Sequence, residues 1–256
     1  MSPRTRTGAP PRTVELTLNG ETVEAREDMT ILQVAKREGI DIPTMCWERT
    51  LTPVNACRVC VCEVKGSRVL VPSCARKVED GMEVETHSER VNHSRKMVIE
   101  FLASSVDLSV MKDAARWIDE YGADPERYGP PAPPFEAGER DRLRAGHHHT
   151  PDGEHAATVA QPTKVDNELY VRDYSKCILC YKCVEGCGTD WQNTFAIAVA
   201  GRGFDAASRP SSPTRCPTRR ACTAATASRS ARRARSCSRA STTTGRPARG
   251  TRTARP

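Results

Sequence analysis

The C-terminal segment of this chain lacks most of the residue types that fold a protein. Residues 206–256 contain no Val, Ile, Leu, Met, Phe, Tyr or Trp, and no Lys, Asp or Glu. Without apolar side chains to bury, the segment cannot offset its loss of chain entropy, so we predict that it is disordered. It holds 13 of the 39 basic residues, which leaves residues 1–205 with 26 basic and 32 acidic residues, a net charge of −6. The acidic body argues against a nucleic-acid partner.

Long apolar runs are also missing. No stretch approaches the ~18 apolar residues of a membrane span, so we expect no direct membrane insertion. Residues 1–12 are basic and have no apolar core, so they predict a disordered start rather than a secretory signal. Twelve cysteines in a chain without an export signal favour metal or cluster ligation over disulfides. The expected location is the cytoplasm or the cytoplasmic face of a membrane complex.

Residues 13–87 predict a small β-grasp unit, so the fold class is α+β. The stretch TVELTLNG alternates polar and apolar residues and ends in Asn-Gly, a hairpin signal. A helix begins at ILQVAKREG, with Asp28 or Thr30 as its N-cap and Gly39 as its stop. The other predicted strands are ETVEAR, RVCVCEV, VLVPS and MEVETH.

The remainder of the body divides into three parts. Residues 88–125 predict a helical segment, because two apolar stripes have helical spacing: Val98, Phe101 and Leu102, then Val110, Ala114, Trp117, Ile118 and Tyr121. Residues 126–165 are rich in Pro, Gly and charge, which is typical of a linker. Residues 166–205 begin a second cysteine-rich unit, in which FAIAVAG predicts the closing strand.

A first set of four cysteines has the spacing C-x10-C-x2-C-x13-C: Cys46, Cys57, Cys60 and Cys74. A [2Fe–2S] cluster needs four thiolates, and one C-x-x-C with two flanking cysteines supplies them. Plant-type ferredoxins use C-x4-C-x2-C…C, so the first gap is six residues longer here. The alternative is a structural zinc site, although zinc ribbons usually have two C-x-x-C knuckles. Small residues at 55 and 56 let backbone N–H groups approach the sulfurs, and Cys62 is predicted to be a packed core thiol.

A second set has the spacing C-x2-C-x2-C-x3-C: Cys177, Cys180, Cys183 and Cys187. This run is typical of ferredoxins with two [4Fe–4S] clusters, in which the fourth cysteine of one run ligates the other cluster. Residues 166–205 therefore predict the truncated first half of such a domain, with an incomplete [4Fe–4S] site. A zinc site is the alternative, with four ligands packed into eleven residues.

The expected second run is absent as protein but compatible with another reading frame. Reading the third base of one codon with the first two bases of the next gives N-G-C, which includes a cysteine codon. This happens at junctions 220–221, 223–224, 226–227 and 230–231, which reproduces the C-x2-C-x2-C-x3-C spacing. We therefore predict a frameshift near Asp205. The alternative is a natural basic tail for nucleic acid, which would normally also contain Lys and aromatic residues.

These motifs resemble a known family. TILQVAKREGIDIPTMCW, NACRVCVCEVKG, VPSCA and SRKMVIEFLASS are similar to the N-terminal [2Fe–2S] domain of the large iron–sulfur subunit of respiratory complex I. The same domain occurs in the diaphorase part of NAD-reducing hydrogenases and in NAD-dependent formate dehydrogenases. The resemblance implies an electron-transfer subunit without catalytic residues of its own. Its implied partners are a flavin/NAD-binding subunit and a catalytic oxidoreductase subunit.

The chain departs from that family at one position. There the helix after the β-grasp usually leads to a [4Fe–4S] site held by one His and three Cys, whereas no cysteine lies between Cys74 and Cys177. The run His147–His149 stands in the linker and is expected to be solvated. This departure favours a formate dehydrogenase or hydrogenase type of assembly over complex I. The other open functions are a stand-alone [2Fe–2S] redox module or sensor and a zinc-stabilised scaffold.

Overall fold

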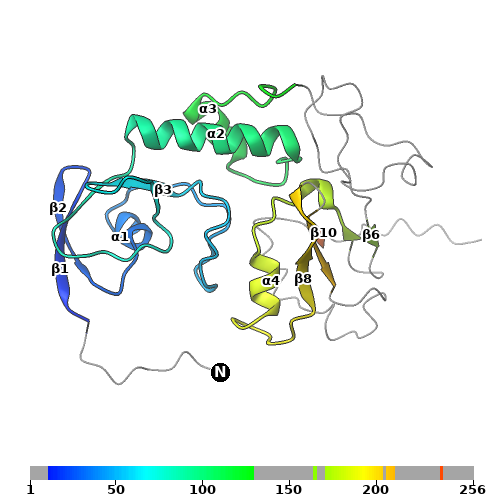
Figure 1. The fold of residues 1–256 in the computed structure, drawn as a ribbon, viewed down its shortest axis with the longest axis horizontal. Helices are drawn as coiled ribbons and strands as arrows, with labels where there is room; N and C mark the ends of the chain where they lie inside the picture. Colours follow the sequence, from blue (N-terminus) through cyan, green and yellow to red (C-terminus); the bar gives the residue numbers. More distant parts are fainter. Residues whose placement is uncertain (1–10, 130–163, 166–170, 204–205, 211–236, 239–256) are drawn as a thin grey trace, which may run out of the picture.

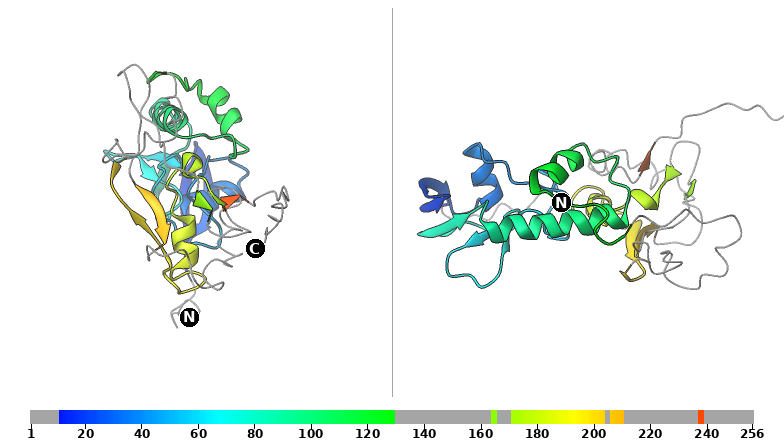
Figure 2. Two further views of the ribbon diagram at one scale, coloured as in Figure 1. Left: turned by 90° about the vertical axis from the view of Figure 1, so that its right-hand side faces the viewer. Right: turned by 90° about the horizontal axis from the view of Figure 1, so that it is seen from above.

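The computed structural model describes five stretches of the chain: residues 11–129, 164–165, 171–203, 206–210 and 237–238. A five-stranded sheet with one helix against it forms the N-terminal part, and a smaller cysteine-rich unit forms the other (Figure 1). A long helix, α2, runs lengthwise past both parts, as the view from above also shows (Figure 2). In these stretches no helix is both long and apolar enough to cross a membrane.

The chain begins with the predicted hairpin. Strands β1 (Thr13–Leu18) and β2 (Glu21–Arg26) pair in antiparallel register, with Leu18 opposite Glu21. The two turn residues, Asn19 and Gly20, both have positive φ angles, of 52° and 88°. Asn and Gly tolerate this conformation, and a turn with two positive φ angles matches the twist of the strands. The Asn-Gly signal is confirmed.

Helix α1 (Ile31–Arg37) is capped by Thr30 and not by Asp28. The Thr30 side chain accepts a hydrogen bond from the Gln33 N–H, and the Gln33 side chain accepts one from the Thr30 N–H, which is a complete capping box. Asp28 instead pairs with Arg26 at 2.6 Å. Two further N–H groups at the helix start donate to the turn that contains Cys74, to Ser73 O and Arg76 O. The start of α1 is thus fastened to that turn.

The sheet has the strand order β2-β1-β5-β3-β4. Its other strands are β3 (Val61–Val64), β4 (Val71–Pro72) and β5 (Met82–Glu85), and β1 runs parallel to β5 while the remaining neighbours are antiparallel. The apolar face of α1 and the inner side chains of β1 and β5 are buried in one core. This is the β-grasp arrangement expected for the segment.

The predicted helical segment is two helices with a break between them. Helix α2 spans Glu89–Ser105 and α3 spans Ala114–Tyr121. Trp117 and Ala114 are buried as expected, but Phe101 is 50 % exposed and stacks on Tyr128 instead of entering the core. The buried face of α2 is rotated by part of a turn from the predicted stripe, because it includes polar side chains that find partners there.

Arg95 is the main polar side chain on that face. It is fully buried, and its guanidinium donates to Val61 O at 3.0 Å and to the Tyr121 hydroxyl at 3.3 Å. Val61 directly follows Cys60, and Tyr121 closes α3. Arg95 therefore ties α2 and α3 to the strand that leaves the first cysteine set.

The cysteine-rich unit contains β7 (Val171–Arg172), a short 3-10 helix (Tyr174–Lys176), α4 (Lys182–Cys187), β8 (Ile197–Ala200) and β9 (Ala207–Pro210). The predicted closing strand is confirmed as β8, which pairs with β9. Strands β6 (Lys164–Val165) and β10 (Cys237–Ser238) flank β7.

Short strands lie inside two segments that the sequence predicts to be a linker and a disordered tail. Strand β6 lies inside the predicted linker, and β9 and β10 lie inside the segment predicted to be disordered. Main-chain hydrogen bonds build β9 without large apolar side chains, since Ala207 and Ser208 are small enough to be buried. Tyr174 also donates its hydroxyl to Ser208 O at 2.8 Å. The rest of the predicted linker and tail, and residues 1–10, lie outside the described residues.

The capping box at Thr30 predicts how substitutions there change the free energy of unfolding. Replacing Thr30 with Ala removes the side-chain acceptor at the helix start and should lower the free energy of unfolding by about 1 kcal/mol. Thr30→Ser keeps the oxygen and should cost less than half of that. Urea unfolding followed by circular dichroism measures both, and an equal loss in the two variants would contradict the role of the hydroxyl.

Candidate metal centres

The first four cysteines lie in loops at one end of the β-grasp sheet. Cys46 follows α1, Cys57 and Cys60 precede β3, and Cys74 follows β4. Cys46, Cys60 and Cys74 are buried, and Cys57 is half-buried. None of the nine cysteines whose side chains are described forms a disulfide. The structure therefore brings the four predicted residues of this set together as thiols.

The pKa values of the four thiols are linked in two pairs. Interaction with the Cys57 thiol lowers the pKa of Cys46 to about 6, and interaction with the Cys74 thiol lowers the pKa of Cys60 to about 7. The same interactions, together with burial, raise the pKa of Cys57 and Cys74 far above the usual thiol range, and the Cys74 thiol donates a hydrogen bond to Asn55 Oδ1 at 3.2 Å. Negative charge on Cys46 further raises the pKa of Cys74, so the two pairs feel each other electrostatically. The arrangement favours one ionised thiol in each pair.

Backbone N–H groups act on the pKa of these thiols. The N–H groups of Ala56 and Cys57 lower the pKa of Cys46, and the N–H of Val59 acts against the rise in the pKa of Cys57. Asn55 and Arg58 stand in this loop, and both have a φ of 59°, in the left-handed region. Such turns form concave groups of N–H donors that stabilise anions.

Cys62 stands apart from the set. It is fully buried in β3 and donates a weak hydrogen bond to Val71 O at 3.6 Å. Burial raises the pKa of its thiol to about 12. Cys62 is a core thiol, as its alternation along the strand predicts.

The second set divides into three cysteines and one. Cys177, Cys180 and Cys183 line one small cavity, and burial raises the pKa of each, that of Cys183 to about 12. Cys187 does not line it. The Cys187 sulfur lies 3.0 Å from Thr194 Oγ1 and accepts a hydrogen bond from the Ala196 N–H at 3.2 Å. The assignment of the first three cysteines to one cluster and of Cys187 to another stays a prediction.

The loop around the three cysteines repeats the backbone chemistry of the first set. Leu179 and Tyr181 have positive φ angles of 52° and 63°. The N–H of Leu179 acts to lower the pKa of Cys177, and the N–H of Lys182 acts to lower that of Cys180, in both cases against the larger effect of burial. Both sets are thus presented by strained turns whose N–H groups favour negative charge on sulfur.

Sequence reasoning missed Ser208 at this cavity. Ser208 is buried and lines the cavity, and it acts against the rise in the pKa of Cys177 and Cys183 that burial causes. It belongs to β9, in a segment whose composition predicted disorder. No motif could have identified it, since its position depends on the pairing of β8 with β9.

The two cysteine sets adjoin each other. Ile178 packs into an apolar cluster with Met45 and Cys57 of the first set's loops. Thr52 donates its N–H and its hydroxyl to the Asp190 carboxylate, at 2.7 and 3.0 Å. The Trp191 indole N–H donates to Thr50 O at 3.1 Å.

The residues that follow α2 also contact the segment that carries the second cysteine set. Lys176 forms an ion pair with Asp107 and holds the pKa of that carboxyl near 2, and the Asp107 N–H donates to Ser175 O at 2.9 Å. The segment that carries the second cysteine set is therefore fastened on two sides to the N-terminal part.

The arrangement of the four thiols of the first set bears on the choice between a zinc ion and a [2Fe–2S] cluster. A structural zinc ion needs four ligands around one point. In the described part of the chain, no three His, Cys, Asp or Glu side chains are grouped around the position of a single metal ion. Two pairs of thiols, held close together with N–H groups that favour negative charge on them, fit a group with two irons and a net negative charge.

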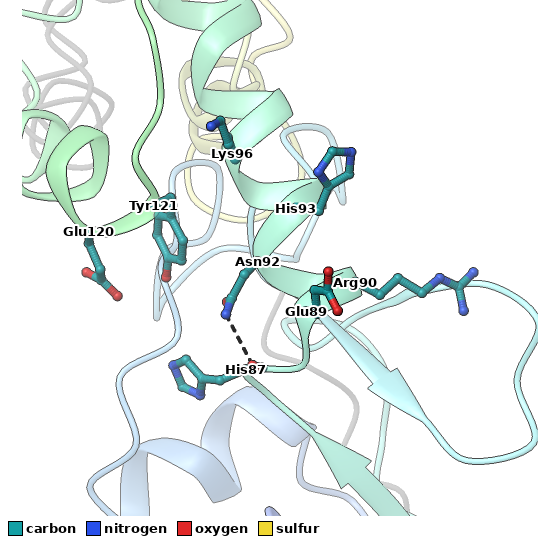
Figure 3. A pocket seen from close by; sticks show the side chains of 8 residues that line it. All are labelled: His87, Glu89, Arg90, Asn92, His93, Lys96, Glu120 and Tyr121. Carbon is teal, nitrogen blue, oxygen red and sulfur yellow. Dashed lines mark hydrogen bonds between the residues drawn. The ribbon is translucent and has the colours of Figure 1, made fainter.

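A wide pocket lies away from both sets (Figure 3). It is open, has a volume of about 830 Å³, and is lined by His87, Glu89, Arg90, Asn92, His93, Lys96, Glu120 and Tyr121. Asn92 donates to His87 O at 3.1 Å across its floor. No cysteine lines it, so it takes no part in the cysteine sites.

Comparison with known proteins agrees with the geometry of the first set. Residues 11–89 match the family described as the 2Fe-2S iron-sulfur cluster binding domain. The match covers the whole β-grasp unit and contains all four cysteines of the first set.

Curated relatives extend the similarity over most of the chain. It is 34 % identical over 200 residues to the NADP-reducing hydrogenase subunit HndD of Solidesulfovibrio fructosivorans, covering 76 % of this chain and 31 % of that protein. It is 31 % identical over 197 residues to the NADPH-Fe(3+) oxidoreductase subunit alpha of Geobacter sulfurreducens, covering 74 % and 20 %. It is 29 % identical over 194 residues to the mitochondrial NADH-ubiquinone oxidoreductase 78 kDa subunit of Candida albicans, covering 75 % and 24 %. The chain thus spans a third or less of the length of these relatives.

A solved structure shares the fold. An NAD+-reducing [NiFe]-hydrogenase in the H2-reduced state superposes with a TM-score of 0.60 at 20 % identity, over 79 % of this chain and 76 % of that one. The predicted resemblance to the complex I and NAD-reducing hydrogenase group is confirmed by these relatives. Residues 11–89 match the family of 2Fe-2S iron-sulfur cluster binding domains, and the chain is similar to subunits of NADP-reducing hydrogenase and NADH-ubiquinone oxidoreductase.

Proposed function

We propose that this chain is an iron–sulfur electron-transfer subunit of an NAD-linked oxidoreductase. It relays electrons between a flavin/NAD site on one partner subunit and a second redox site on a catalytic partner subunit. The observation that carries the proposal is the contact between two cysteine sets, each of which presents thiols to a separate site. The relatives named above are all subunits of NAD(P)-linked oxidoreductases, which supports the same class of function.

The [2Fe–2S] ligands in this proposal are Cys46, Cys57, Cys60 and Cys74. A bound cluster supplies one-electron transfer, which the protein's own side chains cannot perform.

The residues around the thiols prepare them for that group. Ligation requires thiolates, so Cys57 and Cys74, whose pKa values are raised, would have to lose their protons to hold a cluster. The N–H groups of Ala56 and Val59 stay in place and stabilise the resulting negative charge. Burial of Cys60 and Cys74 keeps water away from one side of the site.

The second site is proposed to be half of a pair. Cys177, Cys180 and Cys183 would bind one [4Fe–4S] cluster, and Cys187 would serve another, in the manner of two-cluster ferredoxins. The other half would come from the alternative reading frame after codon 205, which is compatible with four cysteines at the required spacing. As written, the chain lacks the fourth thiolate for the first of these clusters.

The ligand assignment predicts a selective loss of iron. Anaerobically purified protein should hold about two irons at the first site and give a spin-half signal when reduced with dithionite. Cys57→Ala should abolish the signal, because it leaves one iron with a single thiolate. Cys62→Ala is the matched control, a buried cysteine two residues after Cys60, and should keep it. A signal that survives in Cys57→Ala, or zinc in place of iron in the parent protein, would reject the assignment.

The reading-frame proposal predicts a gain of iron. Moving the frame back after codon 205 should supply the second cysteine run and raise the iron content by about eight per chain. The chain as written should hold at most a labile cluster at Cys177, Cys180 and Cys183, lost on exposure to air. Two stable [4Fe–4S] clusters in the unaltered chain would contradict this account, and so would a DNA sequence without cysteine codons at the four junctions.

The partner proposal is tested by reduction with NADH. The isolated chain should not be reduced by NADH, since it offers no catalytic residues of its own. Adding an NADH-oxidising flavoprotein subunit should allow NADH to bleach the visible absorption of the chain. Reduction by NADH without any flavoprotein would contradict the proposal, whereas no reduction with the flavoprotein would favour a stand-alone redox module.

A further inference from the structure

Lys182 occupies an unusual position for a lysine. It is the first residue of α4, it stands within the run that contains Cys180 and Cys183, and only 3 % of its surface is exposed. Lysine is almost never fully buried unless a negative partner is present. None of the ion pairs found among the described residues includes Lys182.

Lys182 stands in the chain between two thiols of the second set, Cys180 and Cys183, and its charge acts on a thiol of each set. Burial raises the pKa of Cys180, and the charge of Lys182 acts against that rise. Interaction with the Cys57 thiol lowers the pKa of Cys46, and the charge of Lys182 lowers it further. The lysine therefore lies within electrostatic range of a ligand from each cysteine set.

The packing keeps Lys182 between the two sets. Ile178, four residues before it, is held in the apolar cluster beside Cys57, and Asp190, after α4, is held by Thr52. These contacts press the start of α4 against the loop of the first site. A buried ammonium is costly without a nearby anion, because it loses its hydration. Thiolate-bound clusters on either side would supply that negative charge.

We infer that Lys182 is a counter-ion shared by the two cysteine sites, and that it raises the reduction potential of the [2Fe–2S] site. The inference rests on the proposed function. Adding an electron makes a thiolate-bound site more negative, and a fixed positive charge in a poorly solvated region favours the reduced form. Because the lysine lies beside both sites, it also weakens the repulsion between them when both are reduced.

The test is a redox titration of the full chain. Anaerobically reconstituted protein is titrated while the spin-half signal of the reduced [2Fe–2S] site is recorded. Lys182→Met keeps the length of the side chain and removes the charge. At a fixed solution potential it should reduce the ratio of reduced to oxidised sites by about tenfold, which is 59 mV for a one-electron couple. Lys182→Arg keeps the charge and should titrate close to the parent.

A matched control removes the same charge at the surface. Lys112 is exposed, and Lys112→Met should leave the midpoint unchanged because solvent and salt screen that charge. Iron content and circular dichroism show whether each variant has kept its site and fold. If Lys182→Met does not fold, Lys182→Gln makes the same comparison with a polar neutral side chain.

The outcomes separate this inference from the proposed function. If the parent chain holds no iron and gives no spin-half signal, the proposed function fails, and the inference falls with it. If the signal is present and neutral variants at 182 titrate like the parent, the inference alone is overturned. An equal shift in Lys112→Met would also overturn it, since the effect would then come from net charge rather than from position.

Discussion

Repulsion between thiolates is the constraint on which the rest of this structure depends. In the proposed cluster site, four sulfurs that would become negative are gathered in a largely buried region, where like charges repel strongly. The fold offsets this with N–H groups from turns at Asn55 and Arg58, and it repeats the device at Leu179 and Tyr181. The turn of Cys74 is held by the start of α1, and β3, which follows Cys60, is held by Arg95 of α2. The secondary structure serves mainly to fix those turns.

The N-terminal part could be predicted from the sequence because its signals are local. Asn19-Gly20 sets a turn, Thr30 and Gln33 set a helix start, and alternation sets the strands, whatever the remainder of the chain does. The two cysteine sets could be proposed from the sequence for a related reason. The spacing of ligands around a small inorganic group is restrictive, so few other arrangements fit C-x2-C-x2-C-x3-C.

Other features depend on contacts between distant residues, and these could not be predicted. The sequence places Phe101 on the apolar stripe of the helix, but Arg95 and Glu100 occupy the buried face of α2 instead. Arg95 donates a hydrogen bond to the Tyr121 hydroxyl there, and Glu100 accepts one from Arg127. Ser208 was missed because composition gives no information about which short strand will pair with β8. The contact of Asp190 with Thr52, 138 residues apart in the sequence, leaves no pattern in either segment.

The contacts of Thr50 and Thr52 have a consequence for the order of folding. Asp190 binds a main-chain N–H and Trp191 binds a main-chain carbonyl, so neither partner exists as a binding surface until the loop at 50–52 has its final shape. During synthesis the N-terminal unit emerges first and can fold before the later segment is made. The first cysteine loop is then a template on which the second unit docks. Insertion of iron and sulfide for the proposed cluster at Cys46 and Cys57 would be easiest before that docking. The time available for cluster insertion would then depend on how soon the second unit docks on this loop.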